Sequence, residues 1–365
     1  MARHTYLTAS STLALMLAAC GVPSSDRVPP LGSQMDPQTK QVKSLAGSKD
    51  QPNDVDAQIG FGTRDVKAWR RQRAEACLGP DEAPTSVTEA MLAGIRDPIM
   101  KTDLGQRLAA DVAGHDSTLC TAQAMPLKDG KFGGVYKVHY RAMAVNDTVP
   151  TGQQILHAAH EWRHAWHDVQ GFFTPDIEHN QQHHSAKVFM IEADARAFAT
   201  AVAWQLREQG DNRAWEAALA IKTYRPIAQA FAQKMTTLTV LGDPPITRSD
   251  AALRAAMGVA YRTWFADGDM ARPYAQQLVE RAAGYAFSGQ SWPGARALRY
   301  EEVVGIGRLP GQASSDRESY IQPADVTLAV DDAYQRMSPK DERVPVQGLP
   351  QPVVGRKAAP TPGKG

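Results

Sequence analysis

Seven of the ten histidines of the chain lie between His157 and His184. Within this cluster, His160, Glu161 and His164 form the pattern His-Glu-x-x-His. On a helix, side chains four residues apart lie on one face, so both imidazoles can bind a single metal ion. The glutamate beside the first histidine can take a proton from metal-bound water and pass it to a leaving amine. The pattern therefore predicts a hydrolytic metal site with His160 and His164 as ligands and Glu161 as the general base.

The residues around this short pattern are typical of one amphipathic helix. The composition predicts a helix from Thr151 to about Gln170, with Gly171 as its stop. On that helix, four histidines fall within about 80° of one another, opposite an apolar face. They are His157, His160, His164 and His167. The alternative is a histidine-rich face that is simply exposed to solvent.

A catalytic zinc usually has three protein ligands, and Glu192 is the best candidate for the third. It lies in a second predicted helix, Ser185 to about Gln209. Apolar and small residues lie within about 60° of it on that helix: Val188, Phe189, Ala195, Ala199, Ala203 and Leu206. A carboxylate among such residues is costly unless it is paired or bound to a metal. The alternative partner is Arg196, one turn later, and Asp194 is predicted to be a supporting or surface residue.

The His-Glu-x-x-His pattern, followed by a glutamate on the next helix, resembles the gluzincin type of zincin metallopeptidase. The segments Leu156–His167 and Glu192–Ala195 also resemble an uncharacterised bacterial family labelled "putative metallopeptidase domain". This resemblance spans one strand and two helices. It implies a Zn²⁺ ion held by His160, His164 and Glu192, with Glu161 as the general base.

The same resemblance implies an edge strand beside the cleft, able to pair with an extended peptide substrate. Residues Tyr136 to Tyr140 fit that strand, and both tyrosines are candidate substrate-binding residues. The metzincin subclass is excluded, because His167 and Gln170 stand where its extended motif needs glycine and histidine. No residue is an obvious stabiliser of the oxyanion.

The remaining sequence predicts a mainly α fold with a small β-sheet. Alternating residues predict one strand over 134–145, and everything after about Gln209 is typical of helices. The expected architecture is a zincin-like His-Glu-x-x-His helix and a glutamate helix beside an edge strand, followed by a helical C-terminal part. The folded domain is expected to cover 57–337, with its core motif region at 130–209.

The N-terminus resembles a bacterial lipoprotein signal. Residues 1–19 form a weakly basic start and a short apolar run that ends at Cys20, the residue expected to be lipidated. The following glycine, in place of aspartate, favours the outer membrane, with the protein facing the periplasm. Residues 20–56 are expected to form a flexible tether and 338–365 a disordered tail. The alternative is an ordinary signal peptide with a chance cysteine.

Cys77 and Cys120 are the cysteines that remain after Cys20. In an oxidising periplasm two such thiols are expected to form a disulfide. The alternative is two separate buried thiols.

Composition excludes several classes of protein. The 365 residues carry a formal net charge of +1, which gives no electrostatic basis for binding nucleic acid. No apolar stretch reaches 18 residues, so a multi-span membrane protein is excluded. The leading hypothesis is zinc-dependent peptide-bond hydrolysis in the bacterial cell envelope, on a peptide or protein substrate, with the lipid as the membrane anchor. The alternative is a non-catalytic metal-binding or structural envelope lipoprotein.

Overall fold

A computed structural model describes residues 76–115, 117–125, 133–173, 177–241, 249–312 and 318–337. These residues belong to one compact unit, 52–365. The expected signal segment 1–19, the lipidation site Cys20, the tether 20–56 and the tail 338–365 lie outside the described residues.

The sheet has four short strands in the order β1-β2-β4-β3. Their bounds are Cys77–Leu78 (β1), Thr118–Thr121 (β2), Gly134–Lys137 (β3) and Ala142–Val145 (β4). The β2–β4 pair is parallel, whereas β1–β2 and β3–β4 are antiparallel. β3 is therefore an edge strand, close to the position that the sequence predicted.

The prediction of a single strand over 134–145 is wrong, because this segment is a β-hairpin. A 3₁₀ turn over Val138–Tyr140 separates the two strands, and Arg141 adopts the left-handed conformation with φ 47°. No Gly, Pro or Asn marks this turn, so the alternation of residue types continues through it and hides the reversal. Tyr136 consequently lies opposite Met143 on the same face of the sheet.

The two faces of the sheet pack into different clusters. Leu78, Leu119, Met143 and Val145 join the main core beneath the helices. Cys77, Cys120, Ala142 and Ala144 belong to a smaller cluster on the other face. Cys77 and Cys120 are directly opposite each other in the β1–β2 register and form a disulfide there.

Two helices carry the residues predicted to act on the metal. α4 covers Thr151–Val169 and ends just before Gly171, whose φ of 75° suits a helix stop. α5 covers Gln181–Glu208, and the side chain of Asn180 caps its first turn by accepting from the His183 N–H. α5 therefore begins four residues earlier than the sequence predicted.

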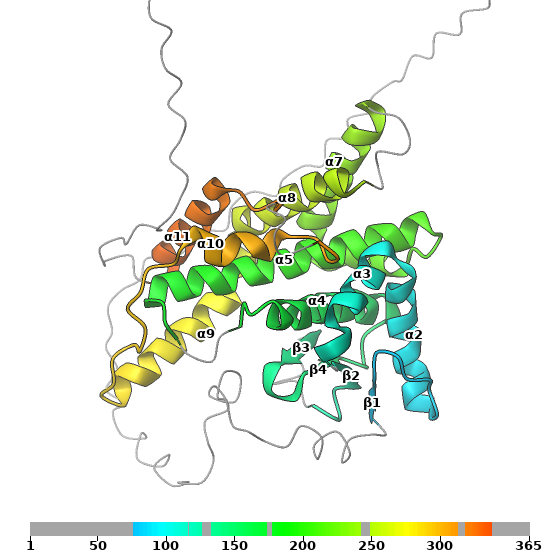
Figure 1. Ribbon diagram of the computed structural model, residues 1–365, viewed down its shortest axis with the longest axis horizontal. Coiled ribbons are helices and arrows are strands. Elements are labelled where there is room, and N and C mark those ends of the chain that lie inside the picture. The colour runs from blue at the N-terminus through cyan, green and yellow to red at the C-terminus, as the bar shows by residue number, and fades with distance from the viewer. Residues whose placement is uncertain are drawn as a thin grey trace, which may run out of the picture. The chain divides into compact units, whose positions relative to one another are not determined.

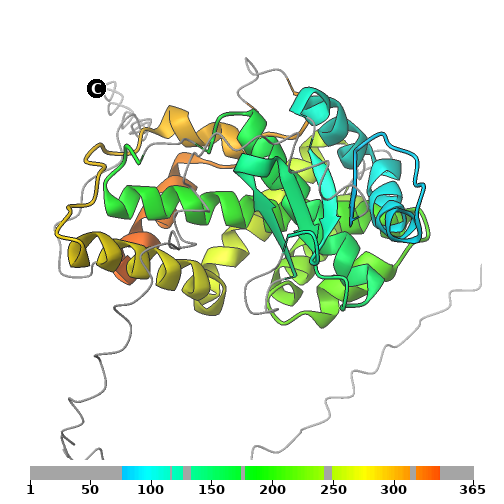
Figure 2. The same cartoon turned by 90° about the horizontal axis from the view of Figure 1, so that it is seen from below.

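The other helices surround α5, which packs against α4 on one side and against α8 and α11 on the other (Figure 1). Figure 2 shows the sheet beside α4 and the N-terminal helices. The remaining bounds are Val87–Lys101 (α2), Asp103–Val112 (α3), Arg213–Ala220 (α6), Arg225–Leu241 (α7), Asp250–Ala266 (α8), Gly268–Phe287 (α9), Tyr300–Val303 (α10) and Pro323–Met337 (α11). The predicted class, mainly α with a small sheet, is confirmed. Among the described helices, none has the length and apolar character needed to span a bilayer.

Candidate metal centre

Three side chains from α4 and α5 converge on one point. The Nε2 atoms of His160 and His164 are 3.0 Å apart. Oε2 of Glu192 lies 3.4 Å from Nε2 of His160, and Oε1 lies 3.5 Å from Nε2 of His164. The structure thus brings together the three residues that the sequence singled out as ligands. The alternative pairing of Glu192 with Arg196 does not occur, since the ion pairs of Glu192 among the described residues are with these histidines.

This cluster fits a divalent metal ion. Two ligand atoms, each about 2.0–2.1 Å from one tetrahedral zinc ion, lie roughly 3.3 Å apart, close to all three observed separations. Oε2 of Glu192 is buried and has no hydrogen-bond partner, as expected of an atom that needs a cation. Burial lowers the pKa of His160 to about 4, so this imidazole is neutral at neutral pH and able to bind a metal. Against the effect of burial, the Glu192 carboxylate raises the pKa of His164, which shows that this cluster places a negative charge where a cation would bind. The geometry of the cluster therefore suits a metal ion.

Glu161 lies beside the cluster and against the edge strand. A ligand-type atom from each of His160, Glu161 and His164 lies within 4.8 Å of the others. The backbone N–H of Tyr136 donates to the Glu161 carboxylate, and burial raises the pKa of this carboxyl to about 8. A buried carboxyl with a raised pKa in a cavity is typical of a group that transfers protons.

The close approach of the edge strand depends on two glycines that sequence reasoning missed. A Cβ on Gly134 would lie 2.9 Å from Cγ of Glu161, and one on Gly133 would lie 2.1 Å from Nε2 of His157. A side chain at either position would force His157, Glu161 or the strand itself to shift. A glycine pair at the start of the predicted strand is the only signal of this in the sequence.

The histidines outside the motif have separate roles. Nε2 of His167 pairs with Asp194 at 2.8 Å, away from the metal cluster. His157 lines the cavity beside the site, where burial lowers its pKa to about 3. Nδ1 of His160 lies 3.3 Å from the hydroxyl of Tyr224, which can orient the ring from behind, as metal-binding histidines usually require.

A buried ion pair joins α4 to α5 beside the metal cluster. Nε of Arg163 donates to Oδ2 of Asp194 at 2.6 Å, and both side chains are fully buried. Nη2 of Arg163 also donates to the carbonyls of Ile306 and Arg308, at 2.8 and 2.6 Å. The hydroxyl of Tyr320 donates to the same aspartate. Asp194 is thus a buried supporting residue, and the C-terminal segments are tied to the helix that carries the motif.

The side chains of Tyr136 and Tyr140 contact other parts of the protein. The Tyr136 hydroxyl donates to Asp168 at 2.8 Å and lies 3.0 Å from Nε2 of His115. Tyr140 packs against the disulfide cluster on the other face of the sheet. The described residues that line the cavity beside Glu161 include neither tyrosine. At the edge strand, the cavity is lined by the backbone of Gly133 and Gly134.

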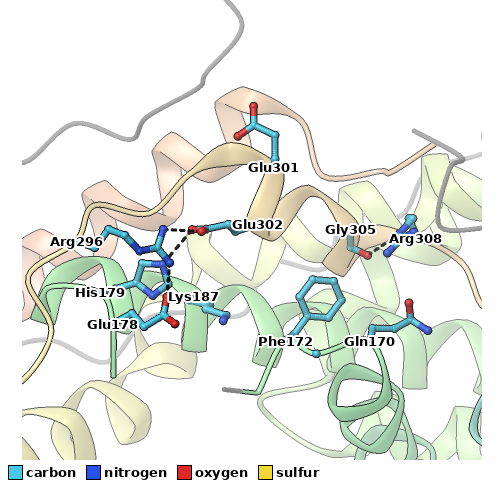
Figure 3. A pocket seen from close by; sticks show the side chains of 11 residues that line it. Gln170, Phe172, Glu178, His179, Lys187, Arg296, Glu301, Glu302, Gly305 and Arg308 are labelled. Carbon is cyan, nitrogen blue, oxygen red and sulfur yellow. Dashed lines mark hydrogen bonds and ion pairs between the residues drawn. The ribbon is translucent and has the colours of Figure 1, made fainter. Parts of the chain in front are cut away.

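A second cavity, of about 330 Å³, lies between the start of α5 and the segment around α10 (Figure 3). Arg296 contacts Glu178 at 2.6 Å and Glu302 at 2.5 Å, and His179 contacts Glu302 at 3.0 Å. These side chains line the cavity, and the positive charge of Arg296 is paired with the two glutamates. None of the predicted metal ligands lines this cavity, so the metal cluster remains the candidate functional site.

Comparison with known proteins agrees with this geometry. No curated protein and no solved structure matches the chain. Residues 70–314 match the family described as "Putative metallopeptidase family (DUF6782)". The matched region contains both helices, the edge strand and every residue of the metal cluster. Because the match covers well over half of the chain, the protein belongs to this metallopeptidase family.

Proposed function

We propose that the protein is a zinc peptidase in which His160, His164 and Glu192 hold the metal and Glu161 is the general base. The observation that carries the proposal is the convergence of two imidazole nitrogens and one carboxylate beside a second, buried carboxyl. When bound, a zinc ion supplies Lewis acidity toward a water molecule and a substrate carbonyl.

The protein's own groups have distinct tasks in this proposal. Glu161 removes a proton from the attacking water and delivers it to the leaving amine, and the N–H of Tyr136 fixes its carboxylate. Tyr224 orients the ring of His160 through Nδ1. The glycine backbone of the edge strand lines the cavity beside Glu161, where an extended peptide can bind.

Two substitutions separate metal binding from hydrolysis. Glu161→Gln should retain zinc, measured by plasma mass spectrometry, and lose cleavage of a quenched peptide library. Glu192→Gln should lose zinc as well as cleavage, because a ligand oxygen is replaced. Glu216→Gln, an exposed position on α6, is the matched control and should change neither.

Two results would overturn parts of the proposal. Full cleavage by Glu161→Gln would show that Glu161 is not the general base. Stoichiometric zinc in the unsubstituted protein without cleavage of any peptide would favour the alternative, a non-catalytic metal-binding envelope lipoprotein.

We also propose that Cys20 is lipidated and anchors the protein in the outer membrane, facing the periplasm. The support is the sequence Leu17-Ala18-Ala19-Cys20 and the glycine after it. Cys20→Ser should move the protein from the membrane fraction to the soluble fraction of expressing cells. An unchanged distribution would contradict the anchor.

A further inference from the structure

The cavity beside Glu161 has room for part of a substrate. Its volume is about 390 Å³, within the ordinary range of ligand pockets. Residues from α4, α5, α9, the edge strand and the turn between α6 and α7 line it. His160 and Glu161 are on its wall, so a ligand there lies next to the proposed reacting groups.

Arg196 lines this cavity and has buried hydrogen-bond donors without acceptors. Its Nε and Nη1 atoms are buried and have no hydrogen-bond partner. The contact of Nη2 is the hydroxyl of Tyr274 at 3.5 Å, the outer limit for a hydrogen bond. The guanidinium carbon lies 4.9 Å from the centre of the Tyr224 ring, which holds it in place. The group is thus positioned by aromatic rings and left with free donors.

Such a group is costly without an acceptor. Burial of a guanidinium whose donors lack acceptors is costly, and the negative charge of Glu192 offsets only part of that cost. Glu192, one turn earlier on α5, directs its oxygens to the two histidines. Glu161 is the one acidic residue among the described residues that line the cavity, and its carboxylate receives the Tyr136 N–H. The cavity therefore lacks an anion that matches Arg196.

We propose that Arg196 binds a carboxylate of the substrate, which makes the protein a peptidase for peptides bearing a negative charge close to the scissile bond. This inference rests on the proposed peptidase function. A carboxylate can accept two hydrogen bonds from a guanidinium, and its charge offsets that of the buried arginine. The carboxylate belongs either to the C-terminus of a short peptide or to an acidic side chain, and the experiment distinguishes these two sources.

The experiment compares matched peptides. One pair differs only in a free C-terminal carboxylate against a carboxamide, and a second, amidated pair differs only in an internal Glu against Gln. The zinc-loaded protein should favour the charged member of one pair by roughly 10- to 100-fold in kcat/KM. Preference in the first pair identifies the C-terminus and preference in the second identifies the side chain. Equal rates within both pairs would overturn the inference and leave the peptidase proposal intact.

Substitution of Arg196 should remove that preference. Arg196→Gln should raise KM for the charged peptide far more than it lowers kcat, and far more than it raises KM for the uncharged peptide. Arg196→Lys keeps the charge without the planar fork and should retain part of the preference. Arg207→Gln, on the exposed side of the same helix, is the control. Zinc content and thermal melting of each variant show whether it has folded.

A binding measurement tests the inference without catalysis. The favoured peptide, or the free-carboxylate peptide if no peptide is cleaved, is titrated into Glu161→Gln by calorimetry. Adding Arg196→Gln to that variant should weaken binding roughly 10-fold or more. Equal affinity with and without Arg196 would overturn carboxylate recognition, whatever the outcome for hydrolysis.

Discussion

Replacing Asp194 with asparagine tests whether the buried ion pair between α4 and α5 stabilises the fold around the metal cluster. The aspartate accepts from Arg163 at 2.6 and 3.3 Å, contacts His167 at 2.8 Å and accepts from Tyr320. Asp194→Asn keeps the shape but removes the charge that compensates a fully buried guanidinium. Breaking such a pair by neutralising one partner costs about 3–5 kcal/mol. We expect a value toward the lower limit, because Arg163 keeps its two bonds to carbonyl groups.

The assay is urea unfolding followed by tryptophan fluorescence, with a chelator present so that metal binding does not contribute. Trp162 and Trp166 are buried on α4 and report on this region. The urea midpoint should fall by more than about 1 M at an unchanged slope. The control is Asp211→Asn, which breaks the partly exposed pair of Asp211 with Arg213 at 2.7 Å and should cost about 0–1 kcal/mol. If the two variants lose the same stability, the reasoning about the buried pair is refuted.

Asp194 also makes the stability of the protein depend on pH, and the direction of this dependence follows from its pKa. Burial raises the pKa of Asp194, but the charge of Arg163 and the hydrogen bond from His167 outweigh it and lower the pKa below its usual value. A group with a depressed folded pKa contributes stability above its unfolded pKa, about 3.9, and loses it as the pH falls through the folded value. Unfolding free energy should therefore decline more steeply below pH 4 in the unsubstituted protein than in Asp194→Asn. Parallel curves would contradict this assignment.

Three further predictions follow from single positions. Gly134→Ala should displace Glu161 and lower hydrolysis roughly 100-fold, while zinc content stays unchanged. Gly94→Ala is the control, because a Cβ there meets nothing within 4 Å, and it should not lower hydrolysis. Equal activity of the two variants would refute the role of the close approach. Tyr136→Phe should cost about 1–3 kcal/mol of stability by removing the bond to Asp168, measured by urea unfolding; a raised KM with unchanged stability would instead indicate a substrate-binding tyrosine. Reducing the Cys77–Cys120 disulfide, which joins residues 43 apart, should lower the unfolding free energy by about 2–5 kcal/mol. A urea midpoint that is unchanged under reductant would contradict a stabilising disulfide.

Two parts of the protein could be predicted from local spacing. His160 and His164 share a helix face because four residues make about one turn, and this relation holds wherever the helix packs. Glu192 and Asp194 lie two positions apart, so helical periodicity directs them to different sides of α5. The assignment of Glu192 to the metal cluster followed from its apolar surroundings, and the structure places its oxygens at 3.4 and 3.5 Å from the histidines. Of the two resemblances, the one to the "putative metallopeptidase domain" family is confirmed by the match over 70–314.

Other features depend on the path of the chain and left no local signal. The hairpin reverses at Arg141, a residue type that does not mark turns, so the strand prediction ran through it. Local spacing could not show that Asp194 pairs with Arg163, 31 residues earlier, or that Tyr320 joins them from the C-terminal part. The free donors of Arg196 become visible only when every neighbouring acceptor is known. The sequence by itself determined that His160 and His164 can bind one metal ion, because that rests on one helical turn. Tertiary structure decided what supports them and what faces the cavity, because burial and long-range pairing arise only when distant segments pack together.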